Sequence, residues 1–236
     1  ELLEWPTAGD DPCGQSWKHA FCHGSRISQI QVQNMSLKGT LPKDFNKLGM
    51  LENLGLQRNQ FSGSLPSFKL RYAFLDYNMF DSIPMDFFDG LDSLEVLALD
   101  SNNFNTTTGW SFPKGLQSSA QLTNLSCMSC NLVGPLPDFL GSFVSLQNLL
   151  LSRNSLSGEL PASFKDNTAL QRLWLNNQEG GGFTGSIDVV AMMESATVLW
   201  LHGNQFTGAI PESIGNLTGL RDLNLNGNKL VGLVPA

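Results

Sequence analysis

The chain has 236 residues, of which 41% are hydrophobic and only 15% charged, and its formal net charge is -7. This composition is too apolar for a disordered chain and allows a substantial core. No run of lysine and arginine occurs, which argues against nucleic acid or an anionic membrane as partner, and neither a stretch of about 18 apolar residues nor a signal peptide is present.

Residues 1–26 share no pattern with the rest of the chain, whose internal repeat begins at residue 27. A stack of repeats needs a polar cover over its first coil, so residues 1–26 are predicted to be an N-terminal capping region. We expect a helix there, with a disulfide between Cys13 and Cys22. His19 and His23 suggest zinc as an alternative, but no C-x-x-C pair or second ligand cluster accompanies them, so no metal is expected.

Residues 27–236 form about nine repeats, most of them about 24 residues long. The clearest copies are "ISQIQVQNMSLKGTLP" from Ile27, "LENLGLQRNQFSGSLP" from Leu51, "LQNLLLSRNSLSGELP" from Leu146 and "LRDLNLNGNKLVGLVP" from Leu220. The pattern L-x-x-L-x-L-x-x-N-x-L-x-G-x-I/L-P predicts one short strand, L-x-L, in every coil. Its alternate residues point into the core or outward onto a shared concave sheet.

An asparagine follows most of the predicted strands, where stacked amides can satisfy buried backbone groups. Positions 59, 78, 102, 154, 204 and 228 hold asparagine, whereas Met35, Cys130 and Gln178 occupy the same slot. The pattern resembles the plant-specific leucine-rich repeat. That resemblance implies an α/β-type solenoid in a right-handed superhelical arc, with a parallel concave β-sheet, a short 3₁₀ or irregular convex side and a disulfide-bonded N-terminal cap.

Three irregular stretches interrupt the repeat: "SLPSFKLRYAF" is shortened, whereas "NFNTTTGWSFPKGLQSSAQ" and "NNQEGGGFTG" are expanded. We expect them to be loops. The last residues, "GLVPA", still follow the pattern without a cover, so we expect the chain to be a fragment of a longer ectodomain.

"CMSC", from Cys127 to Cys130, imitates a redox motif, but both cysteines fall at core positions of the repeat, away from any helix N-terminus. A structural disulfide or two buried thiols are the alternatives. No G-x-S-x-G motif or phosphate loop is present. Asp76 and Asp100 are predicted to be a solvated acidic stretch. The chain is therefore predicted to be non-catalytic and without a cofactor.

The concave face is predicted to change character along the solenoid. Its central outward positions are Gln31, Gly55, Phe74, Ala98, Ser126, Leu150, Trp174, Trp200 and Asn224. Because neighbouring strands lie about 4.8 Å apart, three of these residues should form one apolar, partner-binding patch with two polar residues near its edge: Leu150, Trp174 and Trp200, with Arg172 and His202. The alternative is that the two indoles only stack on each other.

Tyr72 and Phe74, with Tyr77, are a second candidate patch, unless the shortened turn beside them tucks the rings inward. Glycosylation sequons begin at Asn34, Asn105, Asn124 and Asn216. Together with the paired cysteines they favour an extracytoplasmic location. A glycan on Asn124 would shield part of the concave face.

"DPCGQSWKHAFC" followed by "RISQIQVQNMSLKGTLP", and later "LQRLWLNNQ" and "TVLWLHGNQFTGAIP", resemble the transmembrane kinase (TMK) subfamily of plant leucine-rich-repeat receptor-like kinases. The resemblance covers essentially the whole chain, with "EGGGF" and "CMSC" as departures. It implies the first repeat block of a plasma-membrane receptor that faces the apoplast and carries a cytoplasmic Ser/Thr kinase. It also implies auxin-related growth signalling through protein recognition, with a cupin-type auxin-binding protein or a co-receptor as partner.

Two other classes share this repeat. Soluble inhibitors of polygalacturonases are shorter arrays closed by a C-terminal cysteine cap. Receptors proper for peptide hormones have longer arrays and a charged pair that reads a carboxylate. Direct binding of a small hormone is not expected, because strand positions imply no deep enclosed pocket.

Overall fold

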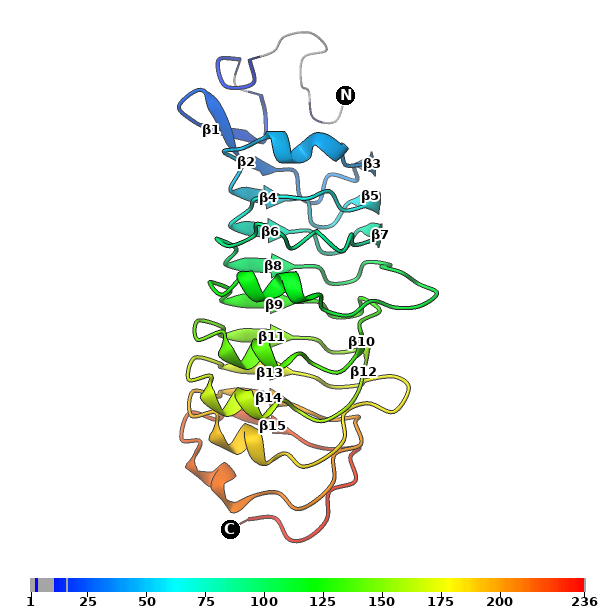
Figure 1. Ribbon diagram of the computed structural model, residues 1–236, viewed down its shortest axis with the longest axis vertical. Coiled ribbons are helices and arrows are strands. Elements are labelled where there is room, and N and C mark those ends of the chain that lie inside the picture. The colour runs from blue at the N-terminus through cyan, green and yellow to red at the C-terminus, as the bar shows by residue number, and fades with distance from the viewer. Residues whose placement is uncertain (1–2, 4–10, 16, 236) are drawn as a thin grey trace.

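The computed structural model describes residues 3, 11–15 and 17–235 of the chain. The coils stack in chain order along one long axis, from β2 in the first coil to β15 in the last (Figure 1). One strand from each of the nine coils, together with β1 of the cap, forms a ten-stranded sheet in the order β1-β2-β4-β6-β8-β9-β11-β13-β14-β15. The predicted leucine-rich-repeat solenoid with a parallel sheet is confirmed.

The strands of this sheet are β1 (Ala20–His23), β2 (Arg26–Gln31), β4 (Asn53–Gly55), β6 (Tyr72–Phe74), β8 (Val96–Ala98), β9 (Asn124–Ser126), β11 (Asn148–Leu150), β13 (Arg172–Trp174), β14 (Val198–Trp200) and β15 (Asp222–Asn224). All pairs except β1 with β2 are parallel. The apolar residue at the centre of each strand pairs with its equivalent in the next coil, so Leu149, Leu173 and Leu199 are in register and fully buried.

The glycine and proline step of each repeat extends the backbone along the flank, where it pairs again. β3 (Lys38–Thr40), β5 (Gln60–Ser64) and β7 (Met79–Ser82) form one short sheet, and β10 (Val133–Gly134) and β12 (Ser155–Leu156) form another. The expanded turns after β8 and β13 project from this flank (Figure 1). The first of them separates the two short sheets.

Six 3₁₀ helices make up the convex side of the coils (Figure 1). They are η1 (Lys43–Lys47), η2 (Lys114–Ser118), η3 (Asp138–Ser142), η4 (Ala162–Asp166), η5 (Asp188–Met192) and η6 (Glu212–Asn216). Proline precedes all but η5, which follows Ile187. Each of these prolines is the last residue before its helix, and because it has no N–H it leaves no donor there to be paired.

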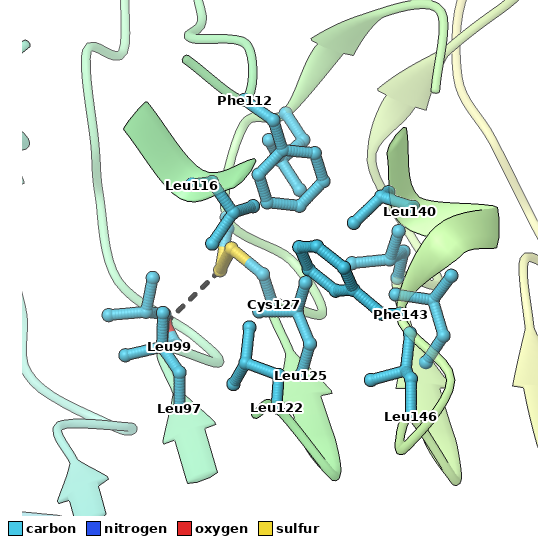
Figure 2. Packing of buried hydrophobic residues seen from close by; sticks show 14 of the residues in the cluster. Leu97, Leu99, Phe112, Leu116, Leu122, Leu125, Cys127, Leu140, Phe143 and Leu146 are labelled. Carbon is cyan, nitrogen blue, oxygen red and sulfur yellow. Dashed lines mark hydrogen bonds between the residues drawn. A yellow bond between two sulfur atoms is a disulfide. The ribbon is translucent and has the colours of Figure 1, made fainter. Parts of the chain in front are cut away.

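The core is a continuous stack of leucine and phenylalanine contributed by successive coils. Figure 2 shows this interdigitation: Leu97 and Leu99 of one coil meet Leu125 of the next, which in turn meets Phe143 and Leu146 of the coil after it. No coil could bury these side chains alone, so each coil depends on its neighbours for stability.

The buried asparagines form a ladder that ties each coil to the preceding one. Asn154 is typical: its Nδ2 donates to the carbonyls of Cys127 and Leu151, and its Oδ1 accepts from the N–H groups of Cys130 and Leu132. Gln178 replaces asparagine and makes equivalent contacts, donating to the Leu151 and Leu175 carbonyls and accepting from the Leu156 N–H.

Cys127 and Cys130 are joined by a disulfide and are both fully buried, so the structural disulfide is the alternative that the structure supports. The Cys130 sulfur occupies the ladder slot and lies 3.1 Å from the Leu99 carbonyl oxygen (Figure 2). It therefore lies beside a carbonyl of the preceding coil, but a disulfide sulfur has no hydrogen and does not donate the hydrogen bond that the amide of a ladder asparagine makes there.

The N-terminal cap contains the expected disulfide between Cys13 and Cys22. The expected helix is wrong for residues 11–15 and 17–26, which form turns and the strand β1, and residues 1–2, 4–10 and 16 lie outside the described part. The Asp11 carboxylate accepts hydrogen bonds from the N–H groups of Cys13 and Gly14. Such a side chain stabilises a turn in competition with helix.

Candidate binding site on the concave face

The predicted row of outward residues exists, and it becomes apolar toward the C-terminal coils. Leu150 pairs in register with Trp174, and Trp174 with Trp200. The two indole rings stack with centroids 4.1 Å apart and planes 18° apart. All three side chains are half-buried, so one surface of the stack stays open to solvent. The stack was one of the two predicted alternatives, and it leaves the proposed partner-binding role untested.

The polar ends of the two indoles differ. Trp200 Nε1 donates a 2.8 Å hydrogen bond to Asp222 on the next strand. Trp174 Nε1 is buried and has no hydrogen-bond partner, and the same is true of Nδ1 of His202, whose ring lies 6.5 Å from Trp200. Asp222 was not predicted as a site residue. It could have been found from the strand register, because it is the first residue of β15, which pairs with β14.

Arg172 and His202 lie at opposite ends of the strands that carry the indoles. Arg172 is exposed, and its Nη1 donates a 3.0 Å hydrogen bond to Asn148 Oδ1. Asn148 in turn contacts Asn124, the third predicted glycosylation site. The polar row along the amino ends of β9, β11 and β13 therefore holds Arg172 away from the opposite edge of the sheet.

No ring contact joins Tyr72, Phe74 and Tyr77 within the described residues, and their role as a second binding patch stays a prediction. Tyr72 donates to Glu95, which also pairs with Arg71. That hydrogen bond to Glu95 raises the pKa of Tyr72. Phe74 is half-buried at the centre of β6, and Tyr77 is exposed at the far edge.

Asp100 is buried, which corrects the expectation of a solvated acidic stretch. Only 8% of it is exposed, and its carboxylate accepts from Ser126 Oγ at 2.6 Å and from the Met128 N–H at 2.5 Å. Burial raises the pKa of Asp100. Burial is also the main cause that raises the pKa of Asp76, and the charge of Asp100 adds to it. These hydrogen bonds compensate the buried carboxylate in place of water.

An open pocket of about 280 Å³ lies where the strands of the concave sheet end. Tyr77, Met128, Arg153, Trp174 and Trp200 are among its lining residues. Arg153 was not predicted as a site residue: it stands one position before the ladder asparagine, where the repeat pattern specifies no residue type.

The other predicted features lie elsewhere. The sequon residues Asn34 and Asn216 are exposed, whereas Asn105 and Asn124 are half-buried, and glycosylation stays a prediction at all four. Across residues 3, 11–15 and 17–235 no helix is long and apolar enough to cross a membrane. The same residues contain no group of three or more His, Cys, Asp or Glu that could hold a metal ion.

Comparison with known sequences gives the same type of repeat and adds similarity to plant receptor-like kinases. The family model described as Leucine Rich Repeat matches residues 145–167 and 195–217. The chain is 38% identical to the receptor-like kinase TMK2 of Arabidopsis thaliana over 97% of its length, and 40% identical to TMK4 of the same plant over 93%. It spans 26% and 24% of those proteins, about a quarter of each.

Two solved structures are similar over nearly the whole chain. One is the ectodomain of the plant membrane receptor kinase GASSHO1/SCHENGEN3 from Arabidopsis thaliana in complex with CASPARIAN STRIP INTEGRITY FACTOR 2. It has a TM-score of 0.88 and 27% identity, over 99% of this chain and 28% of that one. The other is the plant peptide hormone receptor RGFR1 in complex with RGF2, with a TM-score of 0.81 and 28% identity, over 93% of this chain and 38% of that one.

Proposed function

Because the chain is a leucine-rich-repeat ectodomain of the TMK type of plant receptor-like kinase, we propose that it recognises a peptide or protein segment on its concave face. In this proposal it is the first repeat block, residues 27–236 with the cap 1–26, of a plasma-membrane receptor that faces the apoplast. The block itself is non-catalytic, and the kinase domain of the relatives lies outside it.

The row formed by Leu150, Trp174 and Trp200 carries the proposal. These side chains are in register on adjacent strands and half-exposed on a solvent-facing sheet. Because each indole is already half-buried, a ligand can cover only part of the about 150 to 250 Å² that such a side chain buries in full, which stabilises a complex by roughly 1 to 2 kcal/mol per indole before ordering costs. Tryptophan and arginine are the residues most enriched in binding hot spots.

The two similar solved ectodomains support recognition of a peptide, since one is the peptide hormone receptor RGFR1 in complex with RGF2 and the other is bound to CASPARIAN STRIP INTEGRITY FACTOR 2. We further propose, from the resemblance to the subfamily alone, that the receptor acts in auxin-related growth signalling. Its partner in this proposal is a cupin-type auxin-binding protein or a co-receptor. The inhibitor alternative is less favoured, because the similarity to receptor-like kinases extends over nearly the whole chain.

Binding to an array of random short peptides, anchored by their amino ends, tests the proposal. Trp200→Ala should weaken binding of the peptides selected by the parent chain by about 30-fold or more, the effect of a hot spot of roughly 2 kcal/mol. Loss of the indole stack should lower the melting temperature by only a few degrees.

Met192→Ala is the matched control, because Met192 is 54% exposed on η5, on the convex side of the coil that carries Trp174 and precedes that of Trp200. It should bind the same peptides as the parent chain. Equal binding by Trp200→Ala and the parent would contradict the proposal. Inhibition of a polygalacturonase by the parent chain, lost in Trp200→Ala, would favour the inhibitor function instead.

A further inference from the structure

The second coil is shorter than its neighbours and leaves a recess at the edge where the concave strands begin. The copy of the repeat from Leu51 is five residues shorter than the copy from Leu70. Residues 51–69, all of which the structure describes, contain no 3₁₀ helix, since η1 precedes them and η2 lies two coils further on. A pocket of about 460 Å³ lies in this recess, and its lining includes Met50, Lys69, Arg71, Ser93 and Gln121.

A second pocket, of about 420 Å³, continues the recess toward the cap. Met50 and Glu52 line both pockets, so the two are parts of one groove. The second part adds His23 of β1 and four residues of the first concave strands and of the turn before β6: Ser28, Gln29, Asn53 and Tyr72. This amino-edge groove lies at the opposite edge of the sheet from the pocket lined by Trp174 and Trp200.

The charges that line the amino-edge groove cancel. Glu52 and Glu95 contribute two carboxylates, and Lys69 and Arg71 contribute two cations. A phosphate or a polyanion would meet the carboxylates, and a cationic ligand would meet Lys69 and Arg71. The lining therefore favours a ligand that is polar but uncharged.

Part of the groove is fixed before any ligand binds. Arg71 Nε donates a 2.7 Å hydrogen bond to Glu95, and the Tyr72 hydroxyl donates a 2.9 Å hydrogen bond to the same carboxylate. The Arg71 guanidinium carbon also lies 5.3 Å from the centre of the Tyr72 ring. Side chains that already hold one another lose little freedom on binding, so less affinity is spent on ordering them.

The other polar side chains of the groove have hydrogen-bonding capacity to spare. Within the described part of the chain, the side chains of Glu52 and Lys69 have no hydrogen bond or ion pair. Asn53 accepts at Oδ1 from Gln31 Nε2, which leaves its own amide hydrogens without a partner among the described residues. Acceptors and donors are thus available side by side on the exposed Glu52 and its neighbour Asn53.

We propose that the amino-edge groove binds a neutral oligosaccharide. Every sugar hydroxyl both donates and accepts, and pairs of neighbouring hydroxyls match side chains with two polar atoms, such as the Glu52 carboxylate and the Asn53 amide. The Tyr72 ring and Met50, which is 38% exposed, offer apolar surface to the C–H groups of a sugar ring.

A peptide fits this groove less well than a sugar. Peptides are held by apolar side chains that enter desolvated pockets. The aliphatic side chains of the lining are Leu51 and Met50, and Leu51 is already buried in the core. Three strand spacings of about 4.8 Å separate β2 from β8, so the groove is longer than one sugar ring and takes a chain of several.

Calorimetric titration of the whole chain with neutral hexasaccharides of glucose, xylose, mannose and galactose tests the inference. Glu52→Ala should weaken binding of the sugars that the parent chain binds by about tenfold or more, because charge-assisted hydrogen bonds to hydroxyls are lost. The Glu52 side chain is exposed, so the variant should keep the melting temperature of the parent chain.

Gln147→Ala is the matched control. Gln147 holds the same position of the repeat as Glu52, is also exposed, and its carbonyl likewise accepts from two N–H groups of the next coil. It lies outside both parts of the groove, so this variant should bind the sugars like the parent chain. Trp200→Ala should also bind them normally, because its indole lies at the other edge of the sheet.

Three results would overturn the inference. If none of the hexasaccharides binds the parent chain, the groove is not a site for neutral sugars. If sugars bind but Glu52→Ala and Gln147→Ala retain the same affinity, the sugar lies elsewhere. If Glu52→Ala instead loses the array peptides, the groove binds a peptide. Only normal peptide binding by Trp200→Ala contradicts the proposed function, so the two proposals fail separately.

Discussion

At the scale of single residues, Asp100 shows how one coil uses its neighbour to compensate a buried charge. Its carboxylate lies against β9 and accepts from Ser126 Oγ and from the Met128 N–H, while the nearby Asp76 shares the same partly desolvated surface. Burial raises the pKa of both aspartates, with the hydrogen bonds to Asp100 acting in the opposite direction.

The raised pKa of Asp100 predicts a pH-dependent stability. In the window between its unfolded value, about 3.9, and its raised folded pKa, the native state binds more protons than the unfolded state. The free energy of unfolding should therefore fall as pH rises through that window. Urea denaturation from pH 4 upward should show a smaller fall for Asp100→Asn than for the parent chain.

An amide at position 100 keeps an acceptor for the Met128 N–H without a charge, so the two curves should converge at low pH. The control is Asp92→Asn, which removes an exposed carboxylate. A parent curve parallel to that of Asp100→Asn would contradict the assigned direction of the pKa shift.

At the scale of elements, the asparagine ladder makes the turn after each strand possible. Each amide links carbonyl groups of two successive coils. Gln178 keeps the hydrogen bond to the preceding coil, whereas the disulfide-bonded Cys130 fills the slot without an amide donor. The bulge at positions 180–182 depends on glycine: Gly182 has a φ of +72°, and a Cβ there would lie 2.6 Å from Asn204 Oδ1.

Asn154→Ala should remove about 3 to 5 kcal/mol from the free energy of unfolding, because four buried backbone groups lose their partner. Denaturant titration followed by circular dichroism measures the loss. Asn228→Ala is the control: Asn228 holds the same slot in the last coil but is only half-buried, so water can replace part of its contacts and about 1 to 2 kcal/mol is expected. Equal losses would show that burial does not set the strength of the ladder.

At the scale of the whole molecule, the main contacts between the described elements join neighbouring coils, so the stability of the solenoid should vary along its axis. The middle of the stack is fully covered, with Leu149 at 0% exposure, whereas Leu223 on β15 is 36% exposed. The same last coil exposes Val231, Leu233 and Val234.

Hydrogen exchange should therefore be faster at the C-terminal end of the described chain. We expect the amides around Leu223 to exchange on the order of 100-fold faster than those around Leu149, because local opening there breaks fewer contacts. Mass spectrometry of peptic fragments covering the two strands measures this difference. Equal protection would contradict it and indicate that the whole stack opens in one step.

The period of the repeat was sufficient to predict the coils, the concave strands, their register and the row from Leu150 to Trp200. These features follow from the alternation of buried and outward positions along each strand, and every copy of the repeat has the same alternation. The cap was less predictable, since Asp11 favours a turn that the pattern of the repeats does not describe.

The sequence by itself therefore determined which residues face the core and which line the concave surface, because both depend on position within one coil. Only the tertiary structure decided that Trp174 lacks a hydrogen-bond partner, that Asp100 is buried and that Arg153 lines a pocket with both indoles. These properties depend on side chains of other coils, which approach one another across the curved sheet and carry no signal in the period of the repeat.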